Sequence, residues 1–305
     1  MKTVKWICEI LLFYSVAFLV ALLPNRIALR LGDALGLMAF HLVRSRRRVA
    51  LENVGNSLEY LQRQEGWAPS NASAEQIVRR AFMNYGRNLL EACRIYVGRD
   101  AAMVRSLEIR GTEHFVAAQA RQKGVLFFTG HCGNWELMAL SFGVQLSPSS
   151  VLARRLDNPY LNRALEKVRR TYDNSVIYKS GSVKEILARF RRREIIGVLI
   201  DQAVLPAEGC LVGFLGRPAW TTILPALLAR KCGVPLLPLF IHREGERHVA
   251  EIHPEVSFVP EEGGEQGDHL TTAYLTRIIE EYVVRHPTEY YWVHKRWKRA
   301  PPQLP

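Results

Sequence analysis

His131 and Glu136 are the residues whose types and spacing point most directly to chemistry. They lie in the segment GHCGNWE, residues 130–136, which follows the mostly apolar segment 125–129. A histidine held by a carboxylate is a general base with a fixed tautomer. Such a pair can take a proton from a hydroxyl group while its oxygen attacks a carbonyl carbon. The spacing therefore suggests a proton-transfer site.

The five-residue spacing restricts how the two side chains could meet. On a regular helix they would be separated by about 140° around the axis. They meet only if His131 lies in a turn and Glu136 lies in the first turn of a following helix. Gly130 and Gly133 permit such a turn, and Asn134 is of a residue type that caps helices. His131 would then emerge at the carboxyl end of a buried strand, the sheet edge where ligands bind in open α/β folds.

Other chemistries are less well supported. Cys132 is a rival nucleophile, although its place in a glycine turn fits packing equally, and His131 itself could be a hydrogen-bonded core residue. Gly-x-Ser-x-Gly, Gly-x-Gly-x-x-Gly and the Walker loop are absent. The five cysteines show no Cys-x-x-Cys spacing, which favours a reducing compartment. His242, His248 and His253 have uneven spacing, so we expect no metal and no cofactor.

The elements that would position these residues alternate along the chain. Short apolar segments typical of buried strands are 125–129, 150–153, 175–178, 195–200 and 236–242, with 249–253 forming a hairpin with the last. Helical patterns are 25–60, Ser73 to about Tyr96, 158–172, 183–192, 223–232 and about 270–285. Alternation of this kind predicts an α/β fold with a mainly parallel central sheet flanked by helices. Asp201 follows one strand and should share the sheet edge with His131.

The amino terminus predicts a membrane-anchoring helix. Residues 10–23 carry no charge, and about 20 apolar residues are needed to span a bilayer. We expect a transmembrane or interfacial anchor over residues 1–24 and a catalytic domain over residues 25–305. A pair of buried core helices is the alternative, and a signal peptide is less favoured because no small-residue cleavage site follows. Arginines after residue 25, including 46–48, predict that the main body faces the cytoplasm.

The charge of the chain restricts its partners. The 305 residues carry a formal charge of +12, which favours nucleic acid, acidic lipid, a phosphorylated substrate or an acidic protein. Basic clusters at 44–48, 189–193 and 295–299, together with the anchor, suit an anionic membrane surface. Only 295–299 interleaves basic and aromatic residues, so nucleic acid is not expected as a partner. A basic membrane-surface or nucleic-acid binding module remains the non-enzyme alternative.

Four ordered segments resemble a known family. They are GHCGNWE (130–136), RRLDNP (154–159), IDQ (200–202) with GFLGR (213–217), and YWVHKRW (291–297). Together they resemble the bacterial lipid A late acyltransferases and the relatives that acylate mannosylated phosphatidylinositol. Glycerolipid acyltransferases share the related His-x4-Asp pattern. The resemblance spans nearly the whole chain; one departure is Phe214-Leu215, where the family often has two phenylalanines.

The resemblance implies a fold like that of the glycerolipid acyltransferases and an acyl transfer that needs no cofactor. The donor would be a thioester on acyl carrier protein, and the acceptor a hydroxyl of a phosphorylated lipid A precursor at the inner membrane. Lysophospholipid, glycerol phosphate or mannosylated phosphatidylinositol are alternative acceptors. His131 would be the general base and Glu136 its orienting partner. Arg154 would stabilise negative charge or bind a phosphate, with a surface arginine as the structural alternative.

A second group of residues would bind substrate. The group is Asn134, Arg155, Asp201, Gln202, Phe214, Gly216 and Arg217. Arg155 is the substitute for Arg154 if the register differs by one. Asp201 and Gln202 could order the site or contact acceptor hydroxyls, although Asp201 could also be a turn cap. The segment around Phe214 could line an acyl pocket, although aromatic residues are more often plain core.

Overall fold

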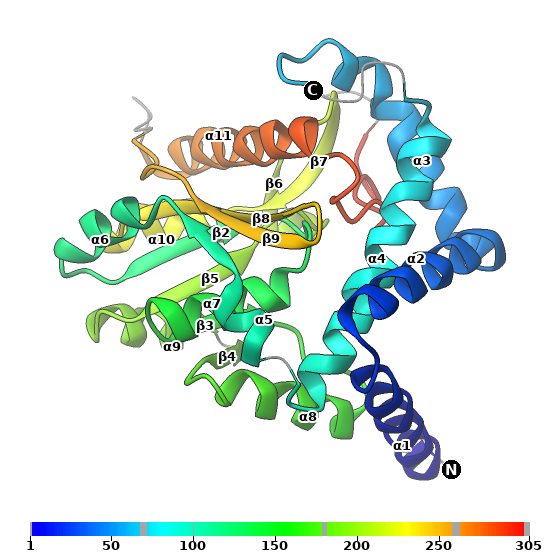
Figure 1. Cartoon of the computed structure of the whole chain (residues 1–305). Coiled ribbons are helices and arrows are strands. Elements are labelled where there is room, and N and C mark those ends of the chain that lie inside the picture. Colours follow the sequence, from blue (N-terminus) through cyan, green and yellow to red (C-terminus); the bar gives the residue numbers. More distant parts are fainter. Residues whose placement is uncertain (1, 68–71, 100, 179–181, 258–262, 302–305) are drawn as a thin grey trace.

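A mostly parallel seven-stranded sheet forms the centre of the molecule (Figure 1). The structure is a computed structural model that describes residues 2–67, 72–99, 101–178, 182–257 and 263–301. In sheet order the strands are β1 (Glu108–Arg110), β9 (Arg247–Ile252), β8 (Leu236–Glu244), β2 (Val125–Thr129), β5 (Ile195–Leu199), β3 (Ser149–Ala153) and β4 (Ser175–Tyr178). The β8–β9 pair is antiparallel and every other neighbouring pair is parallel. The predicted α/β class is thus confirmed.

Helices cover both faces of the sheet, which explains the continuous apolar segments of the central strands. All five residues of β2 are buried. One face packs against α5 (Ala101–Ser106), α6 (Thr112–Ala120) and α7 (Trp135–Gln145). The other face packs against α9 (Ser182–Arg191), α10 (Leu224–Cys232) and α11 (Gly264–Arg285). Phe127 illustrates the first layer, because its ring meets Phe115 of α6 and Phe142 of α7.

A second, helical layer stands at one end of the sheet (Figure 1). It contains α2 (Asn25–Leu42), α3 (Arg44–Gln62) and α4 (Ala74–Tyr96). The predicted cap at Ser73 is confirmed, because its hydroxyl accepts from the Gln76 N–H while the Gln76 side chain accepts from the Ser73 N–H. The segment predicted as one helical region over 25–60 is two helices that meet at Val43.

The predicted strands occur within two residues of their expected bounds, as does the β8–β9 hairpin. The last helix begins at Gly264, six residues before its predicted start near residue 270. Strand β1 was not predicted because three residues are too few for a pattern. The β6–β7 hairpin (Gly209–Phe214 and Arg217–Thr222) was also missed. Its turn places Leu215 at φ 49° and Gly216 at φ 78°, and leucine is not a residue that marks such turns.

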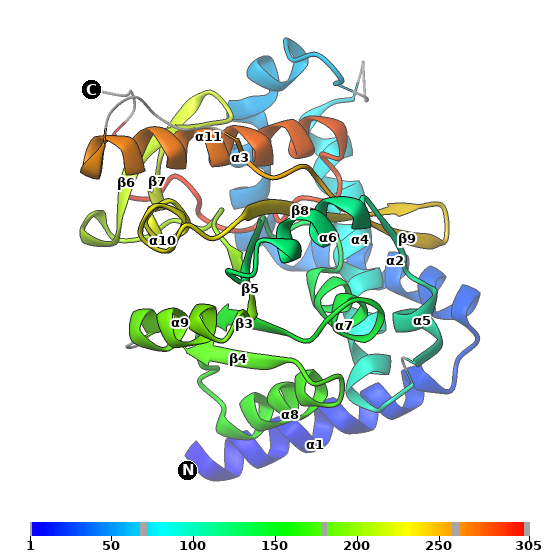
Figure 2. The same ribbon diagram turned by 90° about the vertical axis from the view of Figure 1, so that its left-hand side faces the viewer.

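Helix α1 (Lys2–Ala21) lies along the outside of this architecture. Figure 2 shows it running beside α8 (Pro159–Arg170), and it also packs against α4. Its only buried residues are Ala17, Val20 and Ala21, which rules against the alternative of a buried core helix. Among the described residues, it is the one helix long and apolar enough to cross a bilayer, by length and composition.

Candidate active site

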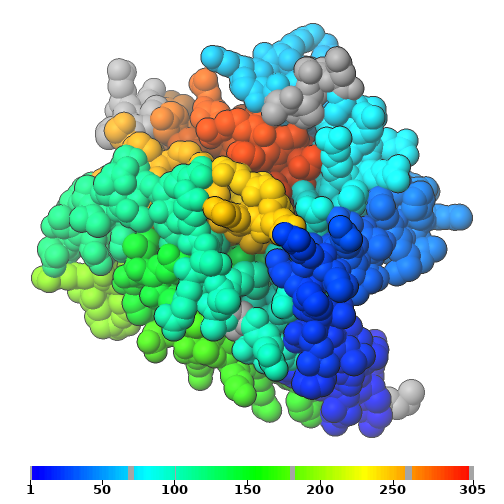
Figure 3. Space-filling model, viewed as in Figure 1, coloured from blue at the N-terminus to red at the C-terminus, as the bar shows by residue number. Residues whose placement is uncertain are grey.

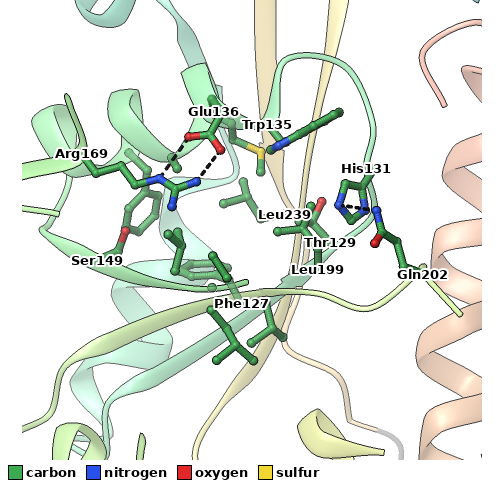
Figure 4. Close-up of a pocket in the computed structure, with 18 of the residues that line it drawn as sticks. Phe127, Thr129, His131, Trp135, Glu136, Ser149, Arg169, Leu199, Gln202 and Leu239 are labelled. Carbon is green, nitrogen blue, oxygen red and sulfur yellow. Dashed lines mark hydrogen bonds and ion pairs between the residues drawn. The ribbon is translucent and has the colours of Figure 1, made fainter. Parts of the chain in front are cut away.

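A cavity of about 280 Å³ lies between α7 and the sheet. Its lining includes His131 and Gln202, whose side chains lie next to each other in Figure 4, and also Phe142 and Ile195. Its walls come from β2, β3, β5 and α7, so the cavity follows the strands from their carboxyl edge inward. The sequence expectation that His131 emerges at this edge is therefore confirmed.

Asp201 is the carboxylate that holds His131. Its Oδ1 lies 2.6 Å from His131 Nδ1, and its Oδ2 accepts the backbone N–H of His131 at 2.9 Å. The neighbouring strands β2 and β5 bring the two residues together, since Thr129 pairs with Leu199 just before them. Burial alone would raise the pKa of Asp201, but the charge and hydrogen bonds of His131 outweigh it and lower that pKa. Asp201 is thus an ionised acceptor.

An ionised Asp201 fixes the tautomer of His131. Because the carboxylate accepts from Nδ1–H, the lone pair of the neutral ring is on Nε2. The Gln202 side-chain nitrogen lies 3.0 Å from that Nε2 and is positioned to donate to it. Gln202 also lines the cavity. The basic nitrogen therefore faces the space that a substrate would enter.

The carboxyl-terminal segment supports the histidine turn from behind. Tyr291 donates its N–H to the His131 carbonyl at 3.0 Å, and the Gly133 N–H donates to the Glu289 carbonyl at 2.9 Å. Gly133 has φ 52°, and a side chain there would collide with the backbone of Ile241. The turn is consequently fixed between two parts of the chain that are distant in sequence.

Glu136 does not hold His131, which corrects the role expected of it. Its carboxylate pairs with Arg169 on α8, at 2.5 Å from Nη2 and 3.2 Å from Nε. The side chain lies in the first turn of α7, as expected, but points toward α8 rather than toward His131 (Figure 4). Arg169 is 8% exposed, so without a carboxylate it would be a buried unpaired cation. Both residues still line the cavity.

Asn134 has the capping role expected of it. Its Oδ1 accepts the Leu137 N–H at 3.1 Å, and its amide nitrogen donates to Glu91 of α4 at 2.8 Å. Glu91 also binds Arg243 and His248. Burial opposes ionisation of Glu91, but these partners lower its pKa to about 2. The Asn134 side chain therefore has a structural role and lies outside the residues that line the cavity, which corrects the expectation that it binds substrate.

Arg154 and Arg155 follow β3 near the mouth of the cavity. Arg154 lines the cavity, and its side chain is 79% exposed beside Asp157, at 3.2 Å. Arg155 instead stacks over the ring of Tyr178, 4.4 Å from its centre. Of the two, only Arg154 lines the cavity, and its exposed side chain could turn from Asp157 to contact a phosphate or an oxyanion.

Phe214, Gly216 and Arg217 do not line the cavity, which corrects the expectation that they bind substrate there. Phe214 is fully buried against the rings of Tyr290 and Trp297. The Gly216 turn lies against the Tyr60 ring. Arg217 stacks over Trp297 at 3.5 Å and donates to the Asn53 carbonyl. These residues join the β6–β7 hairpin to α3 and the carboxyl-terminal segment.

Cys132 is unsuited to act as a nucleophile. Its side chain is 1% exposed, and burial raises the pKa of its thiol well above the usual value. The rival chemistry is therefore unsupported. No group of three or more histidine, cysteine or acidic side chains within the described ranges is placed to hold a metal ion.

The inner part of the cavity is apolar and opens at a glycine. Gly197, in the middle of β5, is flanked across the sheet by Phe127 and Val151. A Cβ atom at Gly197 would come near only Val151 Cγ1, at 4.0 Å. The side-chain position of Gly197 is thus part of the open space. A glycine inside a strand pattern indicates close approach of another group, so this signal in the sequence could have identified Gly197.

Arg169 and Glu91 were also missed from the sequence. Arg169 is one of several basic residues on an amphipathic helix, so nothing in the sequence distinguishes it. Glu91 lies in a helix with no spacing that relates it to Asn134.

The chain is similar in sequence to known proteins. Residues 2–299 match the model of the bacterial lipid A biosynthesis acyltransferase family. The chain is 26% identical to the lipid A biosynthesis lauroyltransferase of Escherichia coli K12, over 95% of this chain and 92% of that protein. It is 24% identical to the palmitoleoyltransferase of the same organism, over 92% and 87%. It is also 24% identical to a phosphatidylinositol mannoside acyltransferase of Mycobacterium tuberculosis, over 75% and 72%.

The chain therefore belongs to the bacterial lipid A biosynthesis acyltransferase family, and the protein is an acyltransferase. This finding confirms the resemblance seen in its four sequence segments. It also excludes the alternative of a non-catalytic binding module.

Proposed function

We propose that this acyltransferase moves a fatty acyl chain from acyl carrier protein to a hydroxyl of a phosphorylated lipid A precursor. The observation that carries the proposal is the His131–Asp201 pair at the mouth of an apolar cavity. A general base and a channel for a hydrocarbon chain are the two parts that this reaction needs.

His131 Nε2 takes the proton from the acceptor hydroxyl, which replaces the Gln202 amide beside it. The hydroxyl oxygen attacks the thioester carbon, forming the new C–O bond. Asp201 stabilises the imidazolium that results. The C–S bond then breaks, and the departing thiolate takes the proton from Nε2. Acid–base catalysis of this type contributes about 10²–10⁴ to the rate.

The acyl chain lies along the inner cavity, past Phe127 and Gly197 toward Phe142. The thioester carbonyl is then close to His131, with Arg154 at the mouth to stabilise developing charge or to bind an acceptor phosphate. The Glu136–Arg169 ion pair forms part of the cavity wall. Because its two charges cancel, it shapes the cavity without adding a net charge near the acyl chain.

The positive charge of the chain suits both proposed partners. The phosphates of the acceptor and an acidic acyl carrier protein would be attracted to the same protein surface. In this proposal α1 anchors residues 25–305, the catalytic domain, to the inner membrane from its cytoplasmic side. The exposed apolar surface of α1 supports the anchoring role.

The lipid A acceptor is preferred over the alternatives because matches to lipid A enzymes cover more of the chain. The lauroyltransferase match covers 95% of this protein, whereas the mannoside acyltransferase match covers 75%. Lysophospholipid and glycerol phosphate acceptors have no such support, and a glycerolipid acyltransferase-like fold remains part of the proposal.

The test uses purified full-length protein, acyl carrier protein loaded with fatty acids, and three acceptors in parallel. The acceptors are a lipid A precursor, a mannosylated phosphatidylinositol and a lysophospholipid, with products identified by mass spectrometry. We expect transfer to the lipid A precursor, and its loss in His131→Ala. Exclusive transfer to another acceptor would overturn the proposed substrate, and full activity of His131→Ala would overturn the mechanism.

A further inference from the structure

Helix α2 exposes a row of large apolar side chains, although it also buries two, Leu29 and Phe40. On its buried side, Gly32 and Gly36 lie directly against α4. A Cβ atom at Gly36 would collide with the Phe82 carbonyl, and one at Gly86 of α4 would collide with Gly32. Close packing through small residues is typical of helices that lie in lipid.

The exposed side of α2 is apolar along one edge and basic along the other. Ile27, Leu31, Met38 and Leu42 are 52%, 38%, 51% and 71% exposed. At about 100° per residue, these four fall within an arc of about 60°. The basic edge beside them contains Arg26, Arg30 and His41. An apolar edge next to a basic edge is the pattern of a helix that lies at the surface of an anionic membrane.

Helix α1 also exposes large apolar side chains. Leu12, Phe18 and Leu19 are 67%, 58% and 64% exposed. The two helices meet at Pro24, where Arg94 of α4 donates to the Leu23 carbonyl and to the Asn25 side chain. Figures 1 and 3 show both helices at the edge of the molecule. We call their exposed apolar side chains the α1–α2 surface.

The contacts of α1 with α8 limit how deeply it can enter a bilayer. Asn158, the cap of α8, donates to the Trp6 carbonyl at 3.2 Å and to Glu9 at 2.9 Å. Helix α8 carries exposed charges, including Lys167 and Arg170. If α1 crossed the hydrocarbon while keeping this contact, it would draw those charges into the bilayer. An orientation along the membrane surface keeps them in water.

We propose that the α1–α2 surface lies in one leaflet of an anionic phospholipid bilayer, with α2 as a second membrane-binding element. Arg26 and Arg30 then lie level with the lipid phosphates, where each basic residue adds to the attraction. The proposal rests on the membrane association in the proposed function. It also gives a role to the hydrogen bonds between Asn158 and α1. The loop that contains Asn158 also contains Arg154, which lines the cavity, so α1 holds this part of the cavity beside the lipid.

The test measures the local environment of α2 in the full-length protein. The background is a Cys8→Ser/Cys210→Ser/Cys232→Ser variant, since the other two cysteines are buried. Single cysteines at Leu31→Cys and Met38→Cys are labelled with an environment-sensitive nitrobenzoxadiazole dye. The matched control is Val116→Cys, because Val116 is 62% exposed on α6, outside the α1–α2 surface. Vesicles contain phosphatidylethanolamine and phosphatidylglycerol.

We expect the dyes on α2 to shift to shorter wavelength on vesicle binding, to brighten severalfold and to be quenched by brominated lipid. The dye at residue 116 should not change. Dyes on α2 that behave like the control, or a protein that binds no vesicles, would overturn the proposal. So would α2 dyes already shielded in detergent by a second copy of the chain.

A second measurement uses unlabelled protein. Met38→Gln/Leu42→Gln keeps helix-forming residues and should weaken vesicle binding by about tenfold, since two large apolar side chains leave the lipid. Val116→Gln should not weaken it. Acyl transfer to detergent-dispersed acceptor should stay at the parent rate in both variants. Unchanged vesicle binding by the double variant would count against the α1–α2 surface, whereas an inactive parent protein would instead refute the proposed function.

Discussion

Two carboxylates differ in environment: Glu136 lines the cavity, and Asp201 holds the His131 ring that lines it. The Asp201 side chain is 2% exposed and is held by the ring and backbone of His131, whereas the Glu136 side chain is 29% exposed and pairs with Arg169. Asp201 can orient the base and stabilise its charged form. Glu136 can keep Arg169 neutralised and shape the cavity wall. The comparison shows that the carboxylate nearest in sequence to a histidine need not be its partner.

The largest expected effect comes from Asp201→Asn. Its amide cannot stabilise the imidazolium and favours the wrong tautomer, so kcat should fall by about 10²–10⁴. Glu136→Gln should lower the rate less, through the unpaired Arg169, and should leave the pH dependence of kcat unchanged. Rates measured from pH 5 to 9 with both variants decide the point, with thermal unfolding as the control for folding. A shifted pH profile in Glu136→Gln alone would reverse the assignment.

Some of these contacts could be predicted from the sequence and others could not, because they depend on different features of the chain. The sheet edge shared by His131 and Asp201 follows from apolar strands and parallel pairing, both visible in the sequence. Which carboxylate holds His131, Glu136 or Asp201, depends on the direction of the Glu136 side chain at the start of α7. The spacing of residues in the sequence does not determine that direction. The contacts of Phe214 and Arg217 depend on a hairpin whose turn has an unusual leucine at positive φ, so the sequence could not place them.

The second effect concerns the inner cavity. Here we expect the space at Gly197, and not a charged group, to determine which acyl chain lengths are accepted. Gly197→Val and Gly197→Leu should place side chains in the proposed acyl channel, because a Cβ atom at this position comes near only Val151 Cγ1. Transfer of the longest accepted chain should fall by about 10–200-fold for each methylene that no longer fits, while shorter chains are still transferred. Competition among donors of different length, read by mass spectrometry, measures this shift.

The matched control for Gly197 is Ile196→Val, on the same strand but packed in the core on the other face of the sheet. It should leave chain-length preference unchanged. Equal preference in the glycine variants and the parent protein would mean that the acyl chain lies elsewhere.

A smaller effect is expected at the cavity mouth. Arg154→Ala should raise KM for the phosphorylated acceptor by about tenfold, as loss of one charge-assisted contact costs about 1.5–3 kcal/mol. Arg155→Ala is the matched control, because its guanidinium stacks on Tyr178 instead of lining the cavity. Initial rates over a range of acceptor concentrations separate KM from kcat. A larger loss in Arg155→Ala would show that the two arginines exchange roles on binding.

The last prediction concerns stability instead of rate and extends the comparison to a third carboxylate, Glu280 of α11. It accepts from the Leu215 N–H and lies 3.3 Å from the Tyr60 hydroxyl. Within the described part of the chain, no basic side chain makes a hydrogen bond or ion pair with it. Burial raises its pKa from 4.5 to about 7. The folded state therefore binds a proton that the unfolded state has lost between pH 4.5 and 7, so stability falls as pH rises through that window.

At pH 8 this ionisation costs about 3 kcal/mol at most, and Glu280→Gln, which resembles the protonated acid, should remove it. The variant should then be more stable than the parent above pH 7 and nearly equal to it at pH 5. Asp201→Asn should instead be less stable than the parent at both pH values, because the lowered pKa of Asp201 stabilises the fold fully above pH 3.8. Urea unfolding of the three proteins at pH 5 and pH 8 measures both signs. Equal pH dependence in Glu280→Gln and the parent would show that Glu280 stays ionised in the fold.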